Sequence, residues 1–156
     1  MKRSDITPEL QVAAFEFLFW FSRFEYALKK NGYLKSTDTG KKAEPNWDGF
    51  VKRNRGKYAL TPAAAALINA RPRQQVVATN AQLAWQELPF AATEFDLQKV
   101  TLLLRLVRNN LFHGGKPADP SWDDPRETIA LLVTCQAVLN ELATFARFND
   151  AYERQH

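Results

Sequence analysis

The segment at residues 8–30 carries more apolar surface than one side of a helix can hide. It begins with Thr7 and Pro8, residues typical of a helix N-cap and of the first helical position. At helical spacing, one apolar stripe consists of Leu10, Ala14, Phe17, Phe21, Phe24 and Leu28, and a second apolar surface of Phe15, Phe19, Trp20 and Tyr26. A helix that is apolar around so much of its circumference is expected to be buried on more than one side. Either it is the central helix of a monomeric bundle, or it is partly covered in a homodimer.

Two short helices and an ambiguous segment are expected after a polar loop at residues 35–45. The apolar face of the first short helix consists of Trp47, Phe50 and Val51. The second begins at Thr61 and ends near Asn69, because a proline three residues later cannot continue it. Residues 75–86 form either a small β-hairpin, which we prefer, or an irregular helical connection.

Two longer helices are expected in the last third of the chain. The first covers about residues 96–113, with an apolar stripe that consists of Leu97, Val100, Leu104, Val107 and Leu111. The second has Asp124 as N-cap, Pro125 at its first position and Glu127 three residues after the cap, and it continues to near Phe148. The sequence therefore predicts a single all-α domain over residues 1–156. Its expected architecture is a compact up-and-down bundle of four to five helices with a small β-hairpin near 75–86.

Composition narrows the class of protein further. The 156 residues carry a formal net charge of +4, which suits a nucleic-acid partner. Cys135 is the single cysteine and lies in an apolar helical pattern, which excludes a disulfide framework and a cysteine-rich zinc site. Glu16 interrupts the apolar N-terminal segment, and no window approaches the uninterrupted length of a membrane span. We expect a soluble cytoplasmic protein without a membrane partner.

Other common chemistries find little support in the sequence. A phosphate-cradling glycine loop precedes a helix N-terminus, whereas Gly114 and Gly115 follow a helix C-terminus. A metal site needs several clustered ligands, and the second histidine, His156, is the last residue. A cysteine nucleophile would have to be Cys135, which is expected in the core. We therefore expect neither a metal nor another cofactor.

The late helix at residues 96–113 ends in a group of polar residues suited to phosphate chemistry. Arg105, Asn109 and His113 lie opposite the apolar stripe, and Asn109 and His113 are one turn apart. Arg108 lies at the edge between the two faces, where its long side chain can reach the polar side. His113 falls in the last turn, where the helix dipole favours its protonated form.

The run Arg108-Asn109-Asn110-Leu111-Phe112-His113 resembles the Arg-polar-x-x-x-His signature of the HEPN superfamily, the higher eukaryote and prokaryote nucleotide-binding domains. The resemblance implies a small helical bundle and a metal-independent endoribonuclease of toxin–antitoxin or defence systems. It also implies cleavage at a composite cleft in a homodimer, with products that end in a cyclic phosphate. A nucleotidyltransferase-like antitoxin is then a candidate partner. The alternative is an arginine on the surface beside a histidine that caps the helix.

The residue types of this run fit RNA cleavage by the substrate's own 2′-hydroxyl. Such a reaction needs a base, an acid and positive charge on the phosphoryl oxygens, but no metal. His113 can transfer protons near neutral pH, Arg108 offers a charged planar fork, and Asn109 can orient the imidazole or a substrate oxygen. One histidine is short of an acid–base pair, and a twofold dimer would supply the second.

Basic residues around the run are candidate RNA contacts. These substrate-binding candidates are Arg105, Lys116, Lys52, Arg53 and Arg55. Such clusters can hold phosphates, although a solvated helix face has the same composition. Two other functions stay open: a catalytically inactive HEPN module that binds nucleotide, RNA or a regulatory partner, and a helical interaction protein without a nucleic-acid role.

Overall fold

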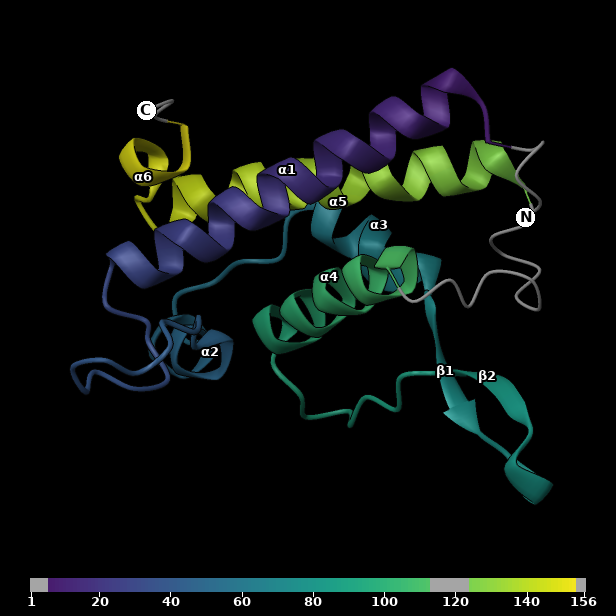
Figure 1. Cartoon of the computed structure of the whole chain (residues 1–156), viewed down its shortest axis with the longest axis horizontal. Helices are drawn as coiled ribbons and strands as arrows, with labels where there is room; N and C mark the ends of the chain where they lie inside the picture. The colour runs from purple at the N-terminus through teal and green to yellow at the C-terminus, as the bar shows by residue number, and fades with distance from the viewer. Residues whose placement is uncertain (1–5, 113–123, 154–156) are drawn as a thin grey trace.

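Two long helices, α1 (Pro8–Lys30) and α5 (Pro125–Phe145), lie side by side along the length of the molecule in the computed structural model (Figure 1). The structure describes residues 6–112 and 124–153. The other elements are α2 (Trp47–Asn54), α3 (Pro62–Ala70), β1 (Arg73–Val77), a 3₁₀ turn (Thr79–Ala81), β2 (Leu83–Glu87), α4 (Asp96–Phe112) and α6 (Asn149–Glu153). The prediction of a helical fold with a small hairpin is therefore confirmed.

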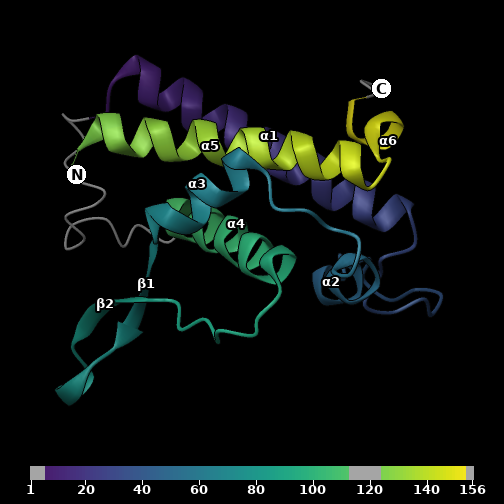
Figure 2. The ribbon, with the colours of Figure 1, turned by 180° about the vertical axis from the view of Figure 1, so that it is seen from behind.

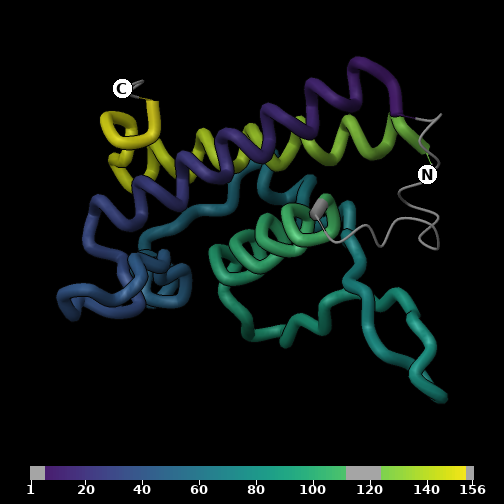
Figure 3. The backbone as a smooth tube through the Cα atoms, viewed as in Figure 1, coloured from purple at the N-terminus to yellow at the C-terminus, as the bar shows by residue number. Residues whose placement is uncertain are grey.

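The shorter helices pack below the long pair and at one of its ends. Helix α3 contacts both α5 and α4, helix α2 contacts α4, and α6 packs on α1 (Figure 2). The path of the chain runs in the same direction along α1 and α5 and in the opposite direction along α4 (Figure 3). Helix α4 is thereby held between α3 and α2, with one face toward the core.

The core is built from the apolar stripes that helical spacing predicts. In α1, Phe17, Phe24 and Leu28 are completely buried, and Ala14 is partly buried. In α4 the predicted stripe is buried from Leu97 to Val107, with Leu111 packed at its edge. The N-caps at Thr7, Thr61 and Asp124 also form as expected, each through a side-chain oxygen that accepts a backbone N–H.

The end of α5 differs from the prediction. We expected one helix to near Phe148, but α5 ends at Phe145, and Arg147 has a left-handed φ of 58°. A sixth short helix, α6, follows this turn, so the described residues form six α-helices instead of four to five. Burial of Phe148 and Tyr152 explains the turn, because a continuous α5 would carry both rings past the core. Arg23 of α1 then donates to the carbonyls of Ala151 and Tyr152, which fixes α6.

The ambiguous segment after α3 is a hairpin, as we preferred. Strands β1 and β2 pair antiparallel, and Asn80 and Ala81 reverse the chain with φ values of 59° each. The hairpin extends away from the helices (Figure 1). At its base, the Asn110 side chain of α4 donates to the carbonyl of Arg73 at 2.8 Å. This bond ties the start of the hairpin to the end of α4.

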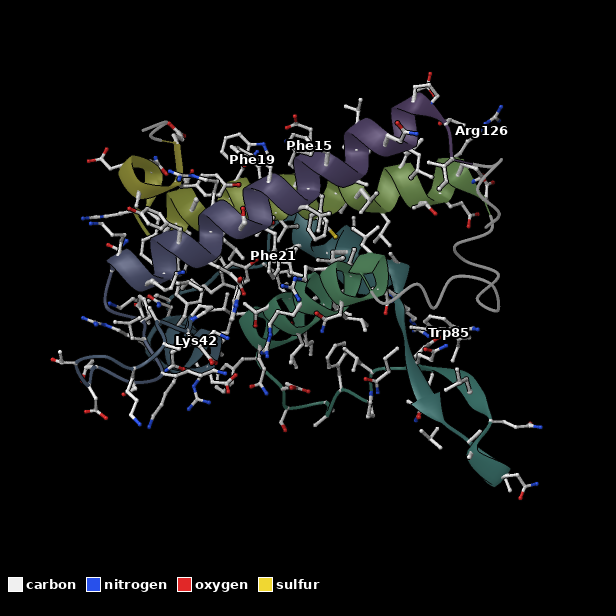
Figure 4. The ribbon with its side chains drawn as sticks, in the orientation of Figure 1. Phe15, Phe19, Phe21, Lys42, Trp85 and Arg126 are labelled. Carbon is white, nitrogen blue, oxygen red and sulfur yellow. The ribbon has the colours of Figure 1, made fainter. Side chains whose placement is uncertain are left out.

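The second apolar surface of α1 is only partly covered within one chain, where Trp20 packs against Tyr152 of α6. Phe15 and Val12 are 66% and 61% exposed, and Phe19 is 39% exposed. Figure 4 shows Phe15 and Phe19 on the outer side of α1, away from α4. Helix α1 thus packs against α5, α6 and α4 within one chain, while Val12, Phe15 and Phe19 stay exposed on its outer side.

Helix α5 differs from the expectation that no segment is long and apolar enough to span a membrane. It has 21 residues, and its most apolar 18-residue window has a mean hydropathy of 1.5, which by length and composition alone suffices to cross a membrane. Its charged residues are Arg126, Glu127 and Glu141. In the structure α5 supplies Leu132, Cys135 and Leu139 to the core against α1 and α3, and a core helix has this same composition.

Candidate functional site

The polar face of α4 presents the predicted arginine and amide side by side. Leu104 and Val107 are completely buried, which turns Arg105 and Asn109 toward the opposite side and leaves Arg108 at the edge. Asn109 is exposed and Arg108 is partly buried at the edge of the core, as the helical spacing predicts. The helix register therefore fixes where these three side chains emerge.

The Arg108 guanidinium contacts both Asn109 and the Phe21 ring. Its Nη1 donates to Asn109 Oδ1 at 3.0 Å. Its central carbon lies 5.9 Å from the centroid of the Phe21 ring in α1, within the range of a cation–π contact. Asn109 thus orients the arginine by a hydrogen bond.

These residues line a cleft of about 370 Å³ between α4, α1, α2 and the loop at residues 35–46. We call it the α4 cleft. Its lining residues are Phe21, Glu25, Lys35, Lys42, Ala43, Glu44, Pro45, Asn46, Trp47, Asp48, Arg105, Arg108 and Asn109. Figure 4 shows Lys42 beside α2 and Phe21 on the side of α1 that faces α4. The fold therefore joins three parts of the sequence that are up to 88 residues apart, from Phe21 to Asn109.

Backbone bonds at the neck of the loop hold its wall of the cleft. Leu34 and Pro45 form an antiparallel bridge, and the N–H of Lys35 donates to the carbonyl of Glu44 at 3.1 Å. The N–H of Asn46 donates to the carbonyl of Tyr33 at 2.9 Å, and its side chain accepts from Gly49 as the N-cap of α2. The neck thus fixes the positions of the residues on either side of it, independently of the conformation of the loop tip.

The charges in the cleft are mostly paired. Glu44 lies 2.9 Å from Lys35 Nζ and 3.6 Å from Lys42 Nζ. The hydrogen bond from Lys35, together with the charges of both lysines, lowers the pKa of the Glu44 carboxyl. Arg105 lies 3.9 Å from the exposed carboxylate of Asp48. Among its described lining residues the cleft has four cationic and three anionic side chains, a small positive excess.

The basic residues of α2 lie outside this cleft. Lys52, Arg53 and Arg55 are all exposed. The Arg55 guanidinium stacks 4.4 Å from the ring centroid of Phe95, and Lys52 and Arg55 line a separate cavity of about 280 Å³. Asp48 borders both cavities. The structure thus brings Arg105 together with Arg108 and Asn109 but leaves the α2 cluster on a neighbouring surface.

The remaining candidate residues fall into two groups. His113 and Lys116 lie outside the described residues, and His113 follows directly on Phe112, the last residue of α4. Cys135 is buried, and burial raises the pKa of its thiol, which disfavours the nucleophilic thiolate. Over residues 6–112 and 124–153, His, Cys, Asp and Glu form no group of three that could hold a metal ion.

Sequence reasoning missed Lys35, Lys42 and Glu44 as site residues. They appeared only as part of a polar loop, since nothing local in the sequence connects that loop with α4.

Comparison with known proteins gives no relative for this chain. No family model matches it, and neither a curated protein nor a solved structure matches it.

Proposed function

We propose that this protein is a metal-independent endoribonuclease of the HEPN type that binds RNA in the α4 cleft. The observation that carries the proposal is the cleft itself, where Arg108 and Asn109 of the signature meet further cationic side chains. Phosphates of RNA are attracted to such a concave cationic surface. His113, the remaining residue of the signature, completes the proposed catalytic set.

Each proposed role follows from the chemistry of the side chain. Arg108 stabilises the charge that develops on the phosphoryl oxygens, because its planar fork can donate two parallel hydrogen bonds. Asn109 positions that fork through the 3.0 Å bond to its Oδ1. His113 transfers the proton of the attacking 2′-hydroxyl or of the leaving 5′-oxygen. The products would end in a 2′,3′-cyclic phosphate.

A homodimer that joins two such clefts is part of the proposal. One histidine per chain does not supply both an acid and a base, and a twofold interface would bring two signatures together. Phe15 and Phe19 project from the outer side of α1, whereas the cleft lies on the side of α1 that faces α4 (Figure 4). An interface through the cleft faces would therefore leave these two rings uncovered.

The finer assignment of fold and setting rests on the same resemblance. A HEPN-type up-and-down bundle is compatible with α4 running opposite to α5, the helix that follows it. A toxin or defence ribonuclease would act in the cytoplasm. A toxin would also pair with a nucleotidyltransferase-like antitoxin.

The test is incubation of the purified protein with structured and unstructured RNA in EDTA. We expect cleavage products with cyclic phosphate ends, and loss of these products for His113→Ala. A matched control is Lys41→Ala, which removes a charge from the loop at a position outside the cleft. Absence of any EDTA-resistant cleavage, or full activity of His113→Ala, would contradict the proposed chemistry.

A second candidate function is RNA binding without cleavage. The observation that favours it is that Lys35, Lys42, Arg105 and Arg108 converge on one cleft, which requires no histidine. Binding of RNA with unchanged affinity in His113→Ala, together with no cleavage by the natural chain, would identify this function.

A further inference from the structure

The Glu44 carboxylate occupies a position that an anion from outside could take. Its Oε2 lies 2.9 Å from Lys35 Nζ, and its Oε1 lies 3.6 Å from Lys42 Nζ. Each carboxylate oxygen therefore faces its own ammonium group. The two non-bridging oxygens of a phosphodiester present the same arrangement of acceptors to such a pair of cations.

The surroundings of Glu44 favour exchange over a permanent ion pair. The side chains of Lys35, Lys42 and Glu44 are 63%, 84% and 39% exposed, so water screens their attraction and the net gain of the pairing is small. The neck of the loop does not depend on the carboxylate, since it is closed by backbone bonds. Glu44 can thus release the lysines without opening the loop.

The same cleft already carries the arginines of α4. Lys35, Lys42, Arg105 and Arg108 line one cavity, so a strand bound at Arg108 passes within reach of the loop lysines. The α2 cluster at residues 52–55 borders a different cavity. The geometry therefore connects the loop lysines, and not the α2 cluster, with the proposed catalytic residues.

We propose that Lys35 and Lys42 form a phosphate subsite of the α4 cleft, which Glu44 fills in the free protein and an RNA backbone phosphate fills in the complex. The identity of the anion as RNA rests on the proposed function. Glu44 acts as an internal competitor, because an anion must displace it to reach the lysines. It therefore lowers the affinity of the cleft for anions that bind non-specifically.

The experiment measures binding of a short fluorescent 2′-O-methyl RNA, which cannot be cleaved through its 2′-oxygens, by anisotropy between about 50 and 200 mM salt. Glu44→Gln removes the competing charge and keeps the shape. We expect it to bind about two- to fivefold more tightly, the range typical of an exposed ion pair. The slope of log affinity against log salt should stay the same, because the same number of phosphate contacts forms in both complexes.

The lysine variants provide the matched arm. Lys35→Gln and Lys42→Gln should each bind about two- to fivefold more weakly, whereas Lys41→Gln, an exposed neighbour outside the cleft, should change affinity less than either. In Glu44→Gln/Lys42→Gln the gain from the first substitution should be reduced, because both act on one site. The subsite would be overturned if Glu44→Gln did not bind RNA more tightly than the natural protein. It would also be overturned if Lys41→Gln and Lys42→Gln lost the same affinity. Thermal melting of each variant separates these results from unfolding.

The failure of this proposal is distinguishable from failure of the ribonuclease. If RNA is not cleaved in EDTA but the Glu44 and lysine variants shift affinity as described, the subsite stands and the chemistry is wrong. If RNA is cleaved but Lys35→Gln and Lys42→Gln bind like Lys41→Gln, the ribonuclease stands and the subsite is wrong.

Discussion

The two basic regions of this protein differ in how the fold assembles them. The residues of the α2 cluster are neighbours in sequence, and successive positions on a helix point about 100° apart, which spreads their charges around the helix. In the α4 cleft, Lys35 and Lys42 come from a loop and Arg105 and Arg108 from a helix more than sixty residues later. Charges that are dispersed in sequence thus converge on the α4 cleft, while Lys52 and Arg55 of the contiguous cluster line a smaller cavity without Arg53.

The two regions also differ in the side chains that surround their cations. In the cleft, Glu25, Glu44 and Asp48 lie among the cations, and Glu44 contacts two of them. In the α2 cluster, Arg55 stacks on the exposed ring of Phe95, and Lys52 and Arg53 are exposed. A region whose cations are held by carboxylates discriminates among anions by how well they displace those carboxylates. An open cluster attracts any polyanion in proportion to its charge.

The largest expected effect is on the rate of RNA cleavage, which should depend on the cleft and not on the α2 cluster. His113→Ala should lower the cleavage rate by about 10²- to 10⁴-fold, the range that one general acid–base group contributes. Arg108→Ala should lower it by about 10²- to 10³-fold, the range for loss of one donor that stabilises transition-state charge. Arg53→Ala should have little effect on this rate. Arg108→Lys keeps the charge but not the planar fork, so it should recover only part of the loss. Single-turnover cleavage assays in EDTA measure all four; equal losses for Arg53 and Arg108 would place the chemistry elsewhere.

The next effect distinguishes the cleft from the core that supports it. Leu104→Ala opens a cavity behind α4 and should lower the free energy of unfolding by about 2–5 kcal/mol. Asn109→Ala, on the exposed side of the same helix, should change it by no more than about 0.5 kcal/mol. Urea unfolding followed by circular dichroism measures both. A large loss of stability in Asn109→Ala would mean that this amide serves the fold and not the cleft.

A smaller effect compares the two regions as RNA contacts. Arg105→Gln should reduce the salt slope of RNA binding by about 0.7, corresponding to one phosphate contact on a single strand. Our sequence prediction assigns phosphate contacts to Lys52, Arg53 and Arg55 as well, and Arg53→Gln tests it directly. A slope unchanged in Arg53→Gln but reduced in Arg105→Gln would restrict binding to the cleft; the reverse result would shift it to α2.

The smallest effect concerns the ring beneath Arg55. Phe95→Ala removes the 4.4 Å contact and should lower stability by about 0.5–1 kcal/mol, as for other exposed cation–π pairs. RNA affinity should stay the same or rise slightly, because the guanidinium is released. A marked loss of affinity would instead show that the ring itself contacts RNA, which calorimetry with the same oligonucleotide would detect.

Much of the fold was predictable because its signals are local. Thr7, Thr61 and Asp124 cap their helices as predicted, and the stripe of α4 is buried from Leu97 to Val107. The end of α5 was missed because the left-handed turn at Arg147 has no glycine to announce it. That turn forms because Phe148 packs against Phe24 and Phe50, rings that are about a hundred residues away.

The candidate site was predictable only on its helical side. Periodicity places Arg105 and Asn109 on one face of α4, with Arg108 at its edge, from the sequence alone. Lys35, Lys42 and Glu44 could not be added, because their position depends on how the loop neck docks beside α2 and α4. Asn110, at an unspecified position of the signature, donates to the backbone of β1, a role that helical spacing cannot predict.

The closed neck of the loop has a consequence for variation in chain length. Residues 37–41 lie beyond the backbone bonds of the neck and turn through Gly40, whose φ is 83°. Doubling the length of a flexible loop costs only about 0.6 kcal/mol in closure entropy. The tip can therefore be lengthened, shortened or exchanged for a foreign peptide while Lys35 and Glu44 keep their register. Such an exchange makes the tip a site for grafting a recognition element at the rim of the cleft.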